Sequence, residues 1–104
     1  MSQQARRIPD DIESSVTKMQ ILMFFHNNPF TLDDLEGVSI WVGMHTEEIA
    51  GEVEQLCQMG LLVKHGRATN PYYSLTDDPE LGELVHRLVE RFARKSRTLR
   101  KWGQ

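Results

Sequence analysis

The sequence predicts a mainly α-helical domain with one small β-hairpin. Between residues 45 and 59, apolar residues recur every three or four positions, which is the spacing of one buried helix face. In residues 61–75 the pattern changes to a short apolar run, a polar turn and an aromatic-rich stretch, which is typical of two strands joined by a turn. Helical spacing also marks the stretches on both sides. We therefore expect a single domain with a modest core in this chain of 104 residues.

Residues 1–9 are expected to form a flexible arm, and residues 10–104 one domain. Pro9 and the acids after it can begin a first helix over residues 10–27, because acidic side chains are favourable near the positive end of a helix. One apolar stripe runs along this helix: Ile12, Val16, Met19 and Met23. Residues 21–25 are apolar on every side, which indicates that this half of the helix is enclosed.

A second, short helix is predicted before Gly43, which would end it. Thr31 and Asp34 have the spacing of a capping box, with Asp in place of Glu, and predict its start. The residues expected to face the core are Leu32, Leu35, Val42 and one of Val38 and Ser39. Trp41 is expected to be the large anchor of this helix.

A third helix is predicted over residues 46–59. The residues expected to face the core are Ile49, Val53 and Leu56. His45 or Thr46 can cap its start, and Glu48 lies three positions after His45, as in a capping box. Gly60 can end it, because a glycine adopts the left-handed conformation at little cost.

The hairpin follows directly. Leu61–Val63 is an apolar run that predicts the first strand, and residues 65–71 form a polar turn with Gly, Asn and Pro. Tyr72–Leu75 is the aromatic-rich return strand, which residues 76–79 end.

The last helix is predicted over residues 80–102, with Asp77 or Asp78 before Pro79 at its start. Its apolar stripe consists of Leu81, Leu84, Val85, Leu88, Phe92 and Leu99. Residues 84–104 carry seven basic side chains and one acidic one, a net charge of +6, against −9 for the rest of the chain. Because the whole chain has a net charge of −3, only local patches could attract nucleic acid.

This order of elements resembles a winged helix-turn-helix domain of the MarR and ArsR type of bacterial transcriptional regulator. The residues that carry the resemblance are Leu56, Gly60, Leu61 and Leu62, then Arg67 in the turn, and Tyr73, Leu75 and Thr76 in the return strand. It covers residues 15–80. The resemblance implies a three-helix core, a two-stranded wing and a long C-terminal helix that takes part in a dimer. Winged helices serve both as DNA readers and as protein-interaction modules, so the fold alone does not decide the function.

The sequence contains no motif for catalysis, since it has no phosphate-binding glycine loop, no paired histidines at metal spacing and no nucleophile elbow. Cys57 is the single cysteine, which rules out an internal disulfide and fits a small buried apolar residue. We therefore expect no catalytic residue, no metal and no cofactor. No apolar run reaches the length of a membrane span, and we expect a cytoplasmic protein.

The third helix is the candidate DNA-reading element, although it carries four glutamates and no Lys or Arg. The residues expected to point outward are Glu47, Gly51, Glu54, Gln55 and Gln58. Gln can pair with an adenine edge and Glu can accept a hydrogen bond from cytosine, but phosphates repel glutamates. The residues expected to contact DNA are Thr46, Gln55 and Gln58 on the helix and Lys64, His65 and Arg67 in the hairpin.

Two functions remain open at this point. The leading one is a non-catalytic transcriptional regulator that binds double-stranded DNA as a homodimer. The alternative is a winged-helix protein–protein interaction module with little or no DNA affinity, which the acidic third helix supports. The dimer is expected because one small domain leaves part of the C-terminal apolar stripe uncovered. The expected interface residues are Leu84, Leu88, Phe92 and Leu99.

Overall fold

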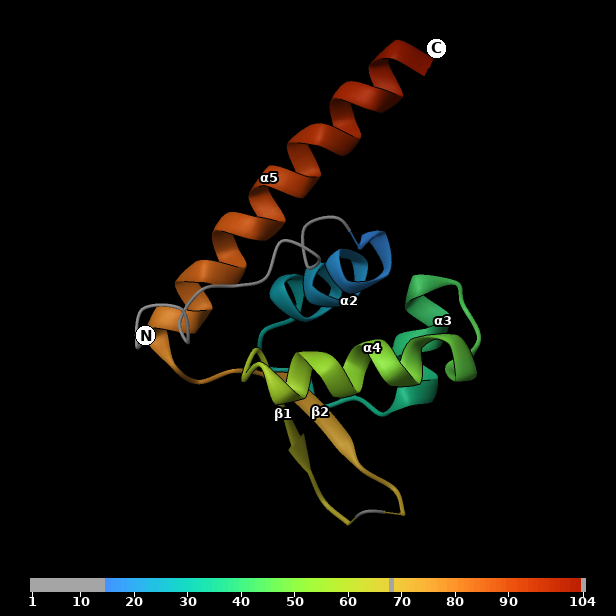
Figure 1. Cartoon of the computed structure of the whole chain (residues 1–104), viewed down its shortest axis with the longest axis vertical. Coiled ribbons are helices and arrows are strands. Elements are labelled where there is room, and N and C mark those ends of the chain that lie inside the picture. Colours follow the sequence, from blue (N-terminus) through green and yellow to red (C-terminus); the bar gives the residue numbers. More distant parts are fainter. Residues whose placement is uncertain (1–14, 68, 104) are drawn as a thin grey trace.

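The computed structural model describes residues 15–67 and 69–103, and for residues 96–103 it describes the helical backbone alone. The elements are α2 (Val16–Asn27), α3 (Leu35–Val42), α4 (Thr46–Gln58), β1 (Leu62–His65), β2 (Tyr72–Leu75) and α5 (Pro79–Gly103). The three shorter helices form a bundle, the hairpin extends from one side of it, and α5 projects from the other side (Figure 1). The predicted fold class, mainly α with a small β wing, is confirmed.

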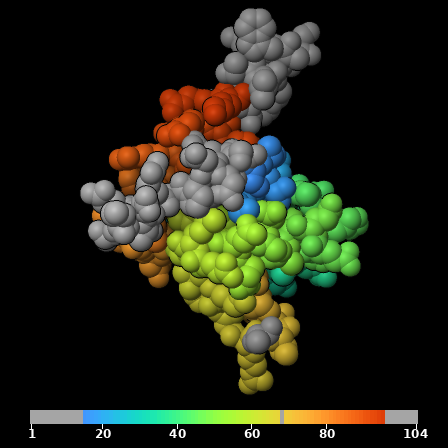
Figure 2. Space-filling model, in the orientation of Figure 1, coloured from blue at the N-terminus to red at the C-terminus, as the bar shows by residue number. Residues whose placement is uncertain are grey.

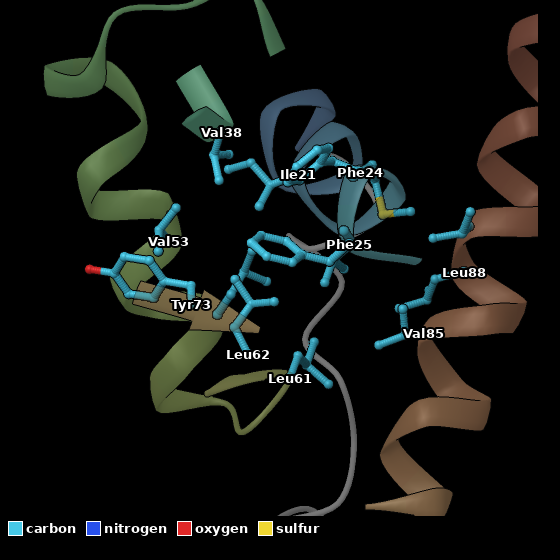
Figure 3. Close-up of a cluster of buried hydrophobic side chains, with 14 of the residues drawn as sticks. Ile21, Phe24, Phe25, Val38, Val53, Leu61, Leu62, Tyr73, Val85 and Leu88 are labelled. Atoms are coloured by element: carbon cyan, nitrogen blue, oxygen red, sulfur yellow. The ribbon is translucent and has the colours of Figure 1, made fainter. Parts of the chain in front are cut away.

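Helix α2 lies at the centre of the domain and contacts α3, α4, α5 and β2. Within residues 21–25, only Met23 is not fully buried; Ile21, Leu22 and Phe25 are 0% exposed and Phe24 is 7% exposed. Figure 3 shows Ile21, Phe24 and Phe25 between side chains of α4 and the hairpin on one side and those of α5 on the other. The predicted enclosure of this half of the helix is confirmed.

The start of α2 differs from the prediction. Ser15 has an extended backbone, and its Oγ accepts a hydrogen bond from the Lys18 amide at 3.2 Å, so the helix begins at Val16 and not at residue 10. Val16 is 58% exposed and does not extend the buried stripe. The predicted arm and Ile12 lie outside the described residues.

A buried charge joins α2 to α4. The Lys18 side chain is 6% exposed, and its ammonium forms an ion pair with Glu52, whose side chain is 32% exposed. A lysine is rarely buried without a partner, because taking its charge out of water is costly. The pair therefore holds α4 in one orientation against α2.

The cap of α3 is Asp34 and not Thr31. Asp34 Oδ1 accepts a hydrogen bond from the Gly37 amide at 2.9 Å. Thr31 cannot take this role, because the chain is extended at Asp33, whose amide donates to the Tyr73 carbonyl at 3.1 Å. The Asp33 carboxylate in turn lies against the helix, where a Cβ on Gly37 would come within 2.0 Å of its Oδ1, so this position requires a glycine.

The inward face of α3 also differs in part from the prediction. Val38 is 0% exposed and Ser39 8%, so both face the core. Leu32 precedes the helix and is 60% exposed. Trp41 is 45% exposed, and its ring is tilted by 45° to that of Phe24 with the centroids 5.3 Å apart, so it is a peripheral contact and not a buried anchor.

Helix α4 confirms its predicted face. The buried residues are Ile49, Val53 and Leu56, each at most 1% exposed. At its start, the His45 amide donates to Glu48 Oε1 at 3.0 Å. Gly43 before it and Gly60 after it have φ angles of 81° and 82°, the left-handed conformation that a glycine favours at a helix end.

The hairpin is antiparallel, with Leu62 opposite Leu75 and Lys64 opposite Tyr73. Because side chains alternate along a strand, these four residues lie on the inner face, where Leu62 is 2% and Tyr73 3% exposed. The outer face carries Val63, His65, Tyr72 and Ser74. The first strand begins one residue later than predicted, at Leu62, and ends two residues later, at His65.

Helix α5 begins as predicted, since Asp78 Oδ1 accepts a hydrogen bond from the Glu80 amide at 2.9 Å. Its residues Val85, Leu88 and Val89 are buried against the core of their own chain. His86 also contacts α2, with its Nδ1 3.0 Å from His26 Nε2. No helix among the described residues is long and apolar enough to cross a membrane.

We expect Leu56→Ala to lower the free energy of unfolding by about 2–5 kcal/mol, because it removes a fully buried side chain from the centre of the core. The control is Ile40→Ala, which removes a side chain that is 78% exposed and should change stability by less than about 0.5 kcal/mol. Chemical denaturation measures both. Equal effects of the two substitutions would contradict the packing described above.

Candidate nucleic-acid interface

One face of the domain is formed by α4 and the hairpin. On α4 the exposed residues include Glu47, Gly51, Glu54, Gln55 and Gln58, as predicted from the helical rotation. Figure 2 shows α4 and the hairpin as one continuous surface, with the hairpin projecting beyond the helix. This shape allows a helix to enter a groove while the hairpin lies beside it.

Three of the four glutamates on α4 have partners within the domain. Glu48 accepts from the His45 amide, Glu52 pairs with Lys18, and Glu54 Oε1 lies 3.1 Å from Lys64 Nζ. Glu47 is the only glutamate of α4 that has no such partner among the described residues. The lysines come from α2 and β1, so the negative field over this face is much weaker than the composition of the helix alone indicates.

Lys64 points toward α4 and not toward the tip of the hairpin. It lies on the inner face of β1, and its hydrogen bond and attraction to Glu54 raise the pKa of the ammonium group. Both groups are exposed, with 43% of the Lys64 side chain and 49% of the Glu54 side chain accessible. The cation is therefore fully charged and lies at the junction between helix and wing.

The other predicted contact residues fall into two groups. Thr46, Gln55 and Gln58 share α4, with Thr46 half-buried in its first turn. His65 lies on the outer face of the hairpin, where its Nε2 is 2.7 Å from Ser74 Oγ, and Arg67 is exposed in the turn. The structure thus brings Lys64 close to the helix, whereas His65 ends β1 and Arg67 lies in the turn that follows.

The basic part of α5 does not join this surface. Helix α5 projects from the side of the domain opposite the hairpin (Figure 1). Its exposed basic residues include Arg87, which lies 3.4 Å from Glu83, and Lys95. Within one chain, the basic residues of α5 and the wing therefore lie on opposite sides of the domain.

The predicted interface residues on α5 also differ in burial. Leu84 and Phe92 keep part of their surface exposed, whereas Leu88 is 7% exposed and packs inside its own chain. The side chain of Leu99 lies outside the described residues. If α5 forms an interface, Leu84 and Phe92 are its accessible apolar residues.

Sequence reasoning missed several exposed apolar side chains outside this face. Phe30 is 98% exposed and Ile40 78%, and Trp41 lies beside Ile40 along α3. The sequence of α3 contained a sign of this exposure. Consecutive helical residues point in different directions, so Val38, Ser39, Ile40 and Trp41 cannot all face the core of the domain.

The described residues contain no cluster of three or more His, Cys, Asp or Glu side chains that could hold a metal ion. Cys57 is half-buried and packs against the core. Burial raises the pKa of its thiol and Glu54 raises it further, while Lys64 lowers it. The raised pKa keeps the thiol protonated and makes it a poor nucleophile.

No family model matches the sequence, and no curated protein matches it. Solved structures do match. HlyU from Vibrio cholerae N16961 aligns with a TM-score of 0.63 at 14% identity, over 80% of this chain and 86% of that one. A MarR family transcriptional regulator from Silicibacter pomeroyi DSS-3 aligns with a TM-score of 0.63 at 21% identity, over 88% of this chain and 67% of that one.

A homodimeric winged helix-turn-helix DNA-binding domain from Mycobacterium bovis, described as a possible ArsR-family transcriptional regulator, has a TM-score of 0.62 at 20% identity. It aligns over 91% of this chain and 82% of that one. At these identities the likeness shows the fold. The chain has a winged helix-turn-helix fold similar to that of these proteins, with α3 and α4 as the helix-turn-helix and β1 and β2 as the wing.

The folded protein should react with a disulfide reagent through Cys57 more slowly than the urea-unfolded chain at the same pH. Because the pKa of the thiol is raised, the reaction rate of the folded protein should begin to rise at a higher pH than that of the unfolded chain. Glu54→Gln should move this rate profile to lower pH, because it removes a carboxylate that raises the pKa. Stopped-flow absorbance measures the rate. A profile at or below that of the unfolded chain would contradict the environment described for Cys57.

Proposed function

We propose that this protein is a non-catalytic transcriptional regulator that binds double-stranded DNA with α4 in the major groove and the wing beside the phosphate backbone. The observation that carries the proposal is the pairing of Glu48, Glu52 and Glu54 with groups of their own domain. A helix with four uncompensated carboxylates would be repelled by phosphates, whereas Lys18 and Lys64 balance two of the four charges here.

The residues left on the exposed face of α4 suit base edges. Gln55 and Gln58 carry amides that can pair with adenine, and Glu47 can accept a hydrogen bond from the amino group of cytosine. These contacts specify sequence but add little affinity. The affinity would come from the wing, where Lys64 and Arg67 supply positive charge.

The Glu54–Lys64 pair sets a condition for binding. A phosphate that approaches Lys64 competes with Glu54, which holds the ammonium group at 3.1 Å. Both side chains are accessible, so water can solvate the carboxylate when it is displaced, and the exchange costs little. The pair thus holds the lysine at the junction of helix and wing until a phosphate takes the place of the carboxylate.

The proposal includes a homodimer formed through α5. Leu84 and Phe92 lie partly exposed along one stripe, which a second copy of α5 would cover. A two-fold dimer would present two α4 helices to two half-sites of a palindromic DNA sequence.

A protein-interaction role is the second candidate, and one observation favours it. Phe30 and Ile40 are 98% and 78% exposed, and Trp41 contributes an accessible ring. Large exposed apolar side chains are typical of protein-binding surfaces. Under this alternative the protein binds no duplex DNA even at low salt.

Replacing both Lys64 and Arg67 by Ala should weaken binding to all duplex sequences, because it removes phosphate contacts and not base contacts. The plot of log affinity against log salt should lose a slope of about two per subunit, or one per contact. Fluorescence anisotropy of a labelled duplex measures this. The control is Arg87→Ala on α5, which should leave the slope unchanged. If micromolar wild-type protein forms no complex at about 50 mM salt, the regulator proposal fails.

Light scattering should give a mass of twice the 12.0 kDa of one chain. Leu84→Glu should reduce this mass to that of a monomer, because it places a charge on the proposed interface while leaving the buried residues of α5 in place. Circular dichroism verifies that the variant remains folded. A monomeric wild-type protein at tens of micromolar would contradict the dimer.

A further inference from the structure

Gly51 lies in the interior of α4, in a place that neither folding nor packing explains. A Cβ at this position would have no atom within 4 Å. Its φ is not positive, unlike that of Gly43, Gly60 and Gly66, so the backbone does not require a glycine there. By contrast, Gly37 in α3 has no room for a side chain.

Glycine is one of the least favourable residues in a helix interior, because it has the most conformational freedom to lose. An alanine at position 51 would fit the structure and favour the helix. The domain itself therefore gains nothing from this glycine. The same holds for Gly82 in α5, so what distinguishes Gly51 is its place on the exposed face of α4.

The position of Gly51 on α4 points to a role for the glycine. Residues four apart lie on one helix face, so Gly51 lies between Glu47 and Gln55, with Gln58 seven positions on along the same exposed face. The face thus has polar side chains at both ends and bare backbone at its centre.

We propose that Gly51 is the point of closest approach between α4 and DNA, and that its missing side chain lets the helix enter the major groove deeply enough for Glu47 and Gln55 to reach base edges. This inference rests on the proposed function. The major groove is about 12 Å wide, and a helix with its side chains is about 10–12 Å across. With so little clearance, one side chain at the centre of the face determines how deep the helix lies.

A partner protein could also use a bare helix surface, but the neighbours of Gly51 favour DNA. Protein interfaces are centred on aromatic or large apolar side chains, and the exposed face of α4 has none. The large exposed apolar residues Ile40 and Trp41 lie on α3 instead.

The experiment compares Gly51→Ala with Gly82→Ala. Gly82 lies in α5, and a Cβ there also has nothing within 4 Å, so it is a matched control. Both substitutions should raise the melting temperature, because both favour a helix without creating a clash. A duplex selected from a random library by the wild-type protein is the probe. Gly51→Ala should weaken binding to it by about tenfold and Gly51→Leu by about a hundredfold, whereas Gly82→Ala should have no effect.

Binding to an unselected duplex should fall less, because it depends on the wing and the phosphates. The inference is overturned if Gly51→Ala binds the selected duplex as tightly as wild type, or if it lowers the melting temperature. If the wild-type protein binds no duplex at all, the proposed function fails, and the inference fails with it. The first result leaves the regulator proposal intact, so the two failures are distinguishable.

Discussion

Helix α2 is surrounded along residues 21–25, and this burial determines where the other elements lie. α3, α4, α5 and β2 each contact it. The apolar contacts place these elements, and two polar ones orient them. The Lys18–Glu52 pair holds α4, and the backbone bonds between Asp33 and Tyr73 hold the hairpin beside the segment that precedes α3. The surface formed by α4 and the wing therefore depends on a helix that contributes no residue to it.

The sequence was informative wherever a contact is local or periodic. The spacing of Ile49, Val53 and Leu56 identified the buried face of α4, and Gly60 identified its end, because both signals lie within a few residues. The sequence was misleading where contacts with a distant segment of the chain determine the structure. Thr31 has the spacing of a cap, but pairing of the adjacent chain with β2 keeps it out of the helix, and Asp34 takes its place. Trp41 has the size of an anchor, but it lies at the edge of the core beside Phe24 and stays 45% exposed.

The charge of the candidate site could not be read from the helix that forms it. Counted alone, α4 has four negative charges and no positive one. Two of these charges are balanced by lysines outside the helix. Lys18, 34 residues before Glu52, pairs with that residue, and Lys64 on the neighbouring strand pairs with Glu54. Such pairs are set by the tertiary structure and have no periodic signature in the sequence. An acidic recognition helix is therefore a weak argument against DNA binding until its neighbours are known.

The ion pair between Glu54 and Lys64 has a mechanical consequence, because it joins the strand of the wing to the helix beside it. While it is closed, the pair adds a weak restraint on the wing to the one that Leu62 and Tyr73 provide by packing in the core. The pair is exposed, so added salt screens it and allows the wing to move more widely. Ionic strength would then act on the stiffness of the protein as well as on its attraction to a polyanion.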